Sequence, residues 1–136
     1  MGDNLRLMAG YSGTPLPKKL GIKADSNVVV LHAPVGFALD GVTFGQRLGK
    51  SHDVIVAFID ERSHFEKAIP LLEKAIFPNG AIWIAWPKKA SKMPTDMTED
   101  VVREVALPRG LVDNKVCAID DTWSGLRIVW RKELRT

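Results

Sequence analysis

Residues able to bind a ligand occur at four places in the sequence, each directly after an apolar run. Histidine and aspartate can exchange protons, lysine attracts anions, glycine lets a ligand approach the backbone, and an indole can stack on a planar ring. Together they predict a site for a small anionic or nucleotide-like ligand without specifying a reaction. The candidates are His32, Gly36, Asp60, Lys88, Lys89, Ser91, Asp120 and Trp123.

The lysines precede a segment that is predicted to be helical from about Asp96 or Thr98. Free amides and the dipole at a helix start favour an anion. Lys88, Lys89 and the nearby Ser91 therefore predict a phosphate, carboxylate or nucleotide site. The alternative is an ordinary solvated loop.

The other candidates have structural alternatives as well. His32 could act as a base or ligand, or simply be hydrogen-bonded at the end of a strand. Asp120 and Asp121 could bind a metal or take up a proton, but adjacent strand residues point to opposite faces, which favours a turn-forming role. Trp123, placed in a polar turn, could stack on a ring or cover the backbone of its own hairpin.

Several common chemistries lack their motifs in this sequence. No G-x-x-x-x-G-K-[ST] phosphate loop is present, so classical nucleotide hydrolysis has no support. His52 and His64 are expected to lie away from the other candidates, and no metal-ligand spacing links them to His32, so we expect no metal site. Cys117 lies within an apolar run and is expected to be a buried, inert thiol. The cofactor stays unknown.

The elements that must position these residues follow from hydrophobic periodicity. Apolar runs at 28–31, 54–59 and 81–86 predict fully buried strands. Helical patterns follow the second and third runs, at 63–76 and from about 96 to 107. Strands that alternate with helices imply a parallel sheet with right-handed crossovers.

Three further features of the pattern make local predictions. Ser63 and Glu66 form a capping box that would begin the first helix. Residues 42–48 alternate weakly and suggest an extra strand. Residues 116–119 and 126–130 predict a C-terminal antiparallel hairpin.

The topology should bring the candidate residues together. Ligands of open α/β sheets bind beyond the carboxyl ends of the parallel strands. We therefore expect one rim to hold the segments 32–37, 60–62, 86–94 and 120–124. The fold class is α/β, a three-layer Rossmann-like domain with a mostly parallel sheet and a C-terminal antiparallel hairpin.

Composition agrees with a single domain. The chain has 136 residues, of which 46% are hydrophobic and 26% charged, with a formal net charge of +3. Residues 1–27 read as a Gly/Pro-rich arm, and residues 28–136 as the α/β domain. A single cysteine, no secretion signal and no membrane-length apolar run predict a cytoplasmic protein with no membrane association. The oligomeric state is left open.

One resemblance is to a known fold. The segments 53–58 and 77–84 resemble the second half of class I S-adenosylmethionine-dependent methyltransferases, over roughly residues 50–131. The resemblance implies a truncated version of that fold. Methyltransferases of this class carry an acidic, glycine-rich turn after the first strand, whereas residues 32–36 read His-Ala-Pro-Val-Gly. This departure puts binding of the usual cofactor in doubt.

A second resemblance is carried by the segments 11–16, 18–22, 86–91, 98–100, 113–120 and 122–126. It spans nearly the whole chain and is to a bacterial family of small proteins of unknown function. It implies a shared fold and no activity.

The alternative to ligand binding is a non-catalytic module on a degenerate methyltransferase-like scaffold. Such a module would dock a protein or RNA partner through the arm and Lys18–Lys19.

Overall fold

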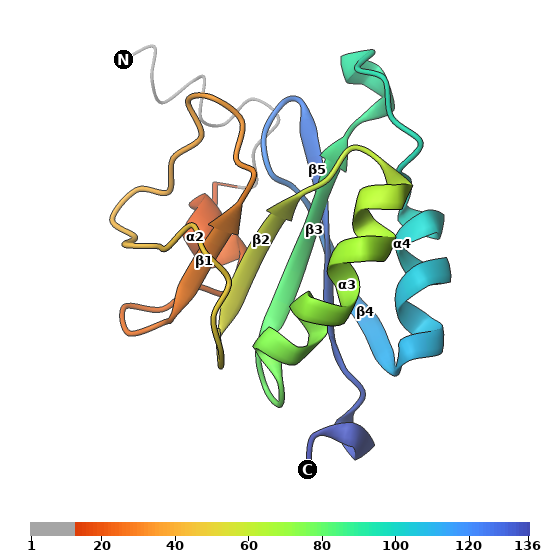
Figure 1. The fold of residues 1–136 in the computed structure, drawn as a ribbon. Helices are drawn as coiled ribbons and strands as arrows, with labels where there is room; N and C mark the ends of the chain where they lie inside the picture. The colour runs from red at the N-terminus through yellow and green to blue at the C-terminus, as the bar shows by residue number, and fades with distance from the viewer. Residues whose placement is uncertain (1–12) are drawn as a thin grey trace.

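The computed structural model describes residues 13–136, which form a five-stranded sheet with helices on both faces (Figure 1). The first twelve residues of the predicted arm lie outside the described part. The main elements are α2 (Leu16–Lys19), β1 (Val28–Leu31), β2 (Val54–Phe58), α3 (Arg62–Ile76), β3 (Ala81–Pro87), α4 (Glu99–Ala106), β4 (Leu111–Ala118) and β5 (Trp123–Trp130), and the 3-10 turns are η1 (Lys89–Ser91), η2 (Leu107–Arg109) and η3 (Lys132–Leu134).

The strand order is β1-β2-β3-β5-β4. β1, β2 and β3 pair in parallel, while β5 is antiparallel to both β3 and β4. β4 therefore runs in the same direction as the first three strands. The hairpin turn between β4 and β5 consequently lies at the carboxyl ends of β1, β2 and β3, where Pro87 pairs with Trp123. The predicted fold class and the common rim of the strand ends are confirmed.

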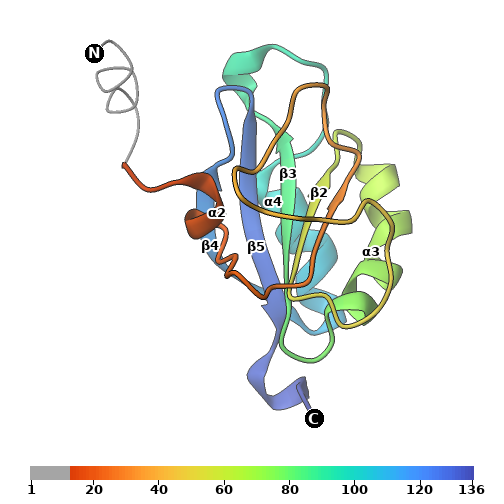
Figure 2. The same ribbon diagram turned by 90° about the vertical axis from the view of Figure 1, so that its left-hand side faces the viewer.

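The molecule has three layers. α3 and α4 cover one face of the sheet, while α2 and the segment between β1 and β2 lie over the other (Figures 1 and 2). Each face has its own buried cluster: the first contains Phe65 and Ile69 of α3, and the second contains Leu20, Leu39 and Trp83. The central strands β2 and β3 are buried along their whole length, which explains their continuous apolar sequences.

The predicted strand over residues 42–48 is wrong. Only an isolated parallel bridge forms there, between Val29 and Gly45. It consists of two backbone hydrogen bonds of 2.9 Å, from Val30 N to the Gly45 carbonyl and from Gly45 N to the Val28 carbonyl. The glycines in this segment disfavour extended backbone, and the segment instead places Val42 and Phe44 against the core.

The predicted capping box at the start of α3 is also wrong. The helix begins at Arg62, with Glu61 as its N-cap residue and no capping bond from that side chain. A carboxylate from a distant loop takes this role, because Arg62 N donates to Asp96 Oδ1 at 2.7 Å. Glu66 is an ordinary helical residue whose carboxylate pairs with the Arg62 side chain.

The start of α4 follows the prediction. Thr98 is the N-cap residue, and its hydroxyl accepts a hydrogen bond from Val101 N. The acidic residues Glu99 and Asp100 occupy the first turn, where the helix dipole favours negative charge.

Residues 13–27 pack against the sheet. Leu20 is 1% exposed, and its carbonyl accepts a hydrogen bond of 3.0 Å from the buried indole of Trp83. Lys19 and Lys115 cross between α2 and β4: Lys19 Nζ donates to the Ala118 carbonyl, and Lys115 Nζ to the Lys19 carbonyl, both at 3.2 Å. Among residues 13–136, no helix has the length and apolar character needed to cross a membrane.

Candidate functional site

A cavity of about 580 Å³ lies at the carboxyl ends of β1 and β2 and is bordered by α3. We call it the rim pocket. It occupies the position where open α/β sheets bind their ligands, because the loops that leave the parallel strands diverge there. Its lining consists of Leu31, His32, Ala57, Phe58, Ile59, Asp60, His64, Lys67, Ala68, Leu72 and Trp123.

The inner wall of the rim pocket is apolar and partly aromatic. Phe58 lies edge-on to Trp123 with ring centroids 5.1 Å apart, and edge-on to Phe37 at 4.9 Å. Leu72 and Ile59, both buried, belong to the core on the helical side. Such a wall suits the flat face of a ring or an aliphatic chain, because the burial of apolar surface from water lowers the free energy of binding.

The mouth of the rim pocket is polar. His32, an exposed residue, has a φ of 56°, a left-handed conformation that is uncommon for residues other than glycine but is adopted more often by histidine, asparagine and aspartate. Asp60 lies in the loop two residues after β2, and His64 and Lys67 come from the first two turns of α3. Together with Glu61, which lies beside the pocket, these residues bring two carboxylates and up to three positive groups around one opening.

His64 is where the sequence-based prediction was wrong. It was expected away from the other candidates, yet it lines the rim pocket, as Asp60 does. Lys67 and Ala68 were not predicted at all. Helical periodicity could have identified these residues. Residues 64, 67 and 68 are spaced three and four apart and so lie on one face of the helix that follows Asp60.

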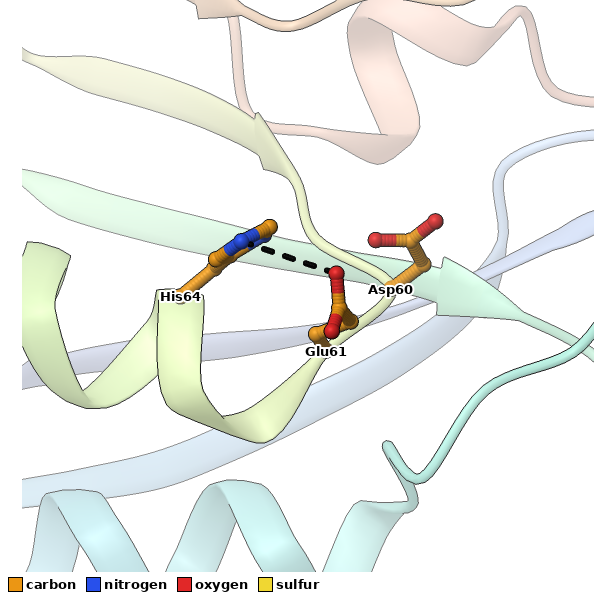
Figure 3. Close-up of side chains that lie close together, drawn as sticks. All are labelled: Asp60, Glu61 and His64. Carbon is orange, nitrogen blue, oxygen red and sulfur yellow. Dashed lines mark ion pairs between the residues drawn. The ribbon is translucent and has the colours of Figure 1, made fainter.

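Three carboxylate and imidazole groups lie close together at this mouth (Figure 3). One ligand atom from each of Asp60, Glu61 and His64 lies within 4.8 Å of the others. His64 Nε2 is 3.5 Å from Glu61 Oε2. Among residues 13–136, this is the group with the composition and spacing to hold a metal ion.

Two predicted residues line a different cavity. A second pocket, of about 530 Å³, lies between residues 13–19 and the β4–β5 turn, and both Lys88 and Asp120 border it. Asp120 has the structural role weighed for it: its Oδ1 accepts hydrogen bonds of 2.8 Å from Thr122 N and Trp123 N. Five of the eight predicted candidates therefore line a cavity, three in the rim pocket and two in the second pocket.

The remaining predicted residues line neither cavity. Gly36 lies in the loop after β1 with a φ of 86°. Lys89 begins the turn η1 and is exposed. Ser91 holds this turn together, since its hydroxyl donates to the Lys88 carbonyl at 2.6 Å and accepts from Met93 N at 3.2 Å.

The lysines were expected to lie just before a helix start, and this prediction is wrong. α4 begins only at Glu99. The segment between the lysines and α4 passes the loop after β2, where Thr95 Oγ1 donates a hydrogen bond of 2.6 Å to the Asp60 carbonyl. The Thr98 side chain already caps α4. The lysine loop therefore offers exposed charge but no free helix amides.

Trp123 is a strand residue rather than a turn residue. It begins β5 and is 8% exposed, so most of its ring packs against the core. Its backbone N–H is bound by Asp120 and its carbonyl by Ile119 N. The ring forms part of the floor of the rim pocket and is not a free stacking platform.

The fold is shared with proteins of known structure. DhpI in complex with SAH (S-adenosylhomocysteine) is similar with a TM-score of 0.56 and 11% identity, over 94% of this chain and 88% of DhpI. Methanococcus jannaschii fibrillarin, a pre-rRNA processing protein, has a TM-score of 0.55 and 14% identity, over 86% of this chain and 69% of its own. A chain of the fibrillarin/Nop5p complex has a TM-score of 0.53 and 12% identity, over 81% of this chain and 75% of its own.

At these identities the comparison concerns the fold alone. The chain has a methyltransferase-like Rossmann fold, as the first resemblance implied. No protein-family model matches the chain, and no curated protein matches it. The resemblance to a family of small bacterial proteins therefore stays a prediction.

Proposed function

We propose that the protein binds, in the rim pocket, a small ligand that combines a flat or aliphatic apolar part with an anionic part. Nucleotides and S-adenosylhomocysteine both belong to this class. The observation that carries the proposal is the pocket itself, in which an apolar wall built from Leu31, Ala57 and Leu72 meets His32 and Lys67 at one opening.

The chemistry of the lining divides the ligand in two. The apolar wall favours the ring or chain, because burial of apolar surface contributes about 25 cal/mol per Å². Lys67 carries a positive charge, and it forms no ion pair with a carboxylate among residues 13–136. The anionic end of the ligand would therefore point to α3.

Two features bear on which ligand is favoured. Structures with this fold include DhpI bound to SAH, which makes S-adenosylhomocysteine the first compound to test. The turn at residues 32–36 holds one glycine and a proline, so it does not offer the bare, glycine-rich backbone of class I methyltransferases. We therefore place nucleotides beside S-adenosylhomocysteine in the same screen.

The test is a binding titration of the full chain with S-adenosylhomocysteine, AMP and adenosine, in the presence of EDTA. We expect S-adenosylhomocysteine, which carries a carboxylate, or AMP, which carries a phosphate, to raise the melting temperature and to give saturable binding by calorimetry. Adenosine, which lacks the charge, should bind more weakly. No saturable binding of any compound at millimolar concentration would overturn the proposal.

A pair of variants locates the site. Lys67→Ala should weaken the binding of the anionic ligand about tenfold or more, since a hydrogen bond to a charged group contributes about 1.5–3 kcal/mol. Lys74→Ala is the matched control, because Lys74 is an exposed lysine in the last turn of the same helix and does not line the pocket. Equal losses in both variants would show that the binding is not in the rim pocket.

A further inference from the structure

The side chains at the start of α3 form a second kind of site at the mouth of the rim pocket. Asp60 lies two residues beyond Phe58, the last residue of β2, Glu61 is the N-cap residue of α3, and His64 lies three residues further. A spacing of three residues places Glu61 and His64 on the same side of the first helical turn. The local fold thus presents two carboxylates and an imidazole together, and Figure 3 shows them on one side of the helix start.

The positive residue within this segment faces away from the group. The Arg62 guanidinium pairs with Glu66 at 3.1 Å and with Glu104 of α4 at 2.9 Å. These two hydrogen-bonded carboxylates raise the pKa of Arg62 and neutralise its charge on the α4 side. Asp60 and Glu61 are therefore not paired with Arg62, and their negative charge stays at the pocket mouth.

We propose that Asp60, Glu61 and His64 bind a divalent first-row transition-metal ion at the mouth of the rim pocket. Carboxylate oxygen with imidazole nitrogen is a ligand set suited to manganese and zinc ions, and three protein ligands leave coordination positions open. Asp60 and His64 also line the rim pocket, so the open positions face the cavity. An anionic ligand there would complete the coordination of the ion.

The geometry requires only small adjustments. Donor atoms around one ion lie closer together than the present limit of 4.8 Å, so the side chains must move inward when the ion binds. Both Glu61 and His64 are free to do so, with side-chain exposures of 59% and 61%. Asp60 forms no side-chain hydrogen bond within residues 13–136, so no existing bond has to break there.

Two local features disfavour the binding of a cation at this position. The amides at a helix start favour negative charge, and Lys67 lies one turn along α3. One of those amides, Arg62 N, is already bound by the Asp96 carboxylate, which adds a further negative charge nearby. Asp60, Glu61 and Asp96 together place three negative charges at the start of α3, which favours a cation there, while Lys67 lies one turn further and stays available to an anionic ligand.

The test uses Mn²⁺ alone with the full chain, followed by calorimetry and by paramagnetic broadening of backbone NMR signals. We expect saturable binding of one ion and selective broadening at residues 60–67. Asp60→Asn and His64→Ala should each weaken Mn²⁺ binding at least tenfold. Glu66→Gln is the matched control, because Glu66 is an exposed carboxylate on the same helix that pairs with Arg62 instead, and it should leave the affinity within twofold.

Each other outcome overturns the metal site. Absence of saturable binding at millimolar Mn²⁺, broadening centred elsewhere, or an equal loss in the Glu66→Gln variant would do so. Circular dichroism and melting curves of the variants establish that they are folded, as expected for partly or fully exposed side chains. The inference deepens the proposed function but fails separately from it, because the ligand titration contains EDTA and the Mn²⁺ titration contains no ligand.

Discussion

His52 is a buried histidine whose two ring nitrogens are both engaged. It is 7% exposed. Its Nε2 accepts a hydrogen bond of 2.7 Å from Gly49 N, so the ring proton is on Nδ1, which donates to Asn27 Oδ1 at 2.9 Å. Burial lowers the pKa of His52, and the negative charge of Asp53 opposes this in part. The neutral imidazole therefore links the segment before β2 to Gly49 and Asn27 through hydrogen bonds.

This arrangement predicts an acid-sensitive contribution to stability. The pKa of folded His52 is below its ordinary value of 6.5, so the unfolded chain takes up the proton more readily. The contribution is fully present above pH 6.5 and is lost as the pH falls below that value. We expect His52→Gln, which cannot titrate, to lose less free energy of unfolding than the native chain between pH 7.5 and pH 5.5.

Urea denaturation at a series of pH values measures this difference. Between pH 7.5 and 8.5 the two proteins should differ by a constant amount, because His52 is neutral there in both states. Parallel loss of stability by both proteins down to pH 5.5 would contradict the assignment.

Cys117 is the other residue whose environment bears on its chemistry. It lies half-buried on β4, and burial raises the pKa of its thiol, although Lys19 and Lys115 nearby lower it in part. A thiol with a raised pKa is a poor nucleophile. The structure thus agrees with an inert role, although the side chain is less buried than its apolar sequence neighbours suggested.

At the scale of elements, α2 has a stabilising role despite its short length. It has only four residues, too few to form a helix in isolation. Tertiary contacts hold it: the Leu20 side chain is buried beside Val28 and Trp83, and the Leu20 carbonyl binds the Trp83 indole. Without this partner, a buried N–H group would lose its hydrogen bond.

We therefore expect Leu20→Ala to destabilise the protein by about 2–5 kcal/mol, the usual cost of removing a large side chain from a packed core. Lys18→Ala within α2, two residues before the C-cap residue Leu20, is the control, since Lys18 is exposed and should change stability by less than about 0.5 kcal/mol. Chemical denaturation of both variants measures the free energies. A loss below about 1 kcal/mol for Leu20→Ala would mean that α2 is not part of the cooperative fold.

At the scale of the whole molecule, the strands differ in their protection. β2 and β3 are buried along their entire length and have neighbours on both sides. β4 forms the edge of the sheet, has an irregular register between Asp113 and Lys115, and exposes several residues near its carboxyl end. β1 forms the other edge, with one bridge to Gly45 as its outer partner.

Native-state hydrogen exchange should follow this order. The amides of β2, β3 and β5 should exchange only through global unfolding, whereas those of β1 and β4 that face outward should exchange through smaller openings. NMR-detected exchange with the dependence on denaturant measures both classes. Equal protection of the outward amides of β4 and the amides of β3 would indicate that a second chain covers this edge.

The sequence by itself determined the core strands, both long helices and the rim. Continuous apolar runs are typical of strands buried on two faces, and the alternation with helices leaves few topologies. The expectation that residues 120–124 share a rim with the segments that follow β1, β2 and β3 followed from this rule, and the parallel direction of β4 explains why it holds. Of the eight candidates expected on this rim, His32, Asp60 and Trp123 line the rim pocket.

Tertiary structure alone decided which polar groups meet. The carboxylate of Asp96, far along the chain, rather than the hydroxyl of the local Ser63, accepts the hydrogen bond of the first amide of α3. The helix begins at Arg62, and His64 in its first turn lines the rim pocket. Such contacts depend on distances between segments that are remote in sequence, and local periodicity carries no information about them. The same reason separates Lys88 from His32, two residues on one rim that border different cavities.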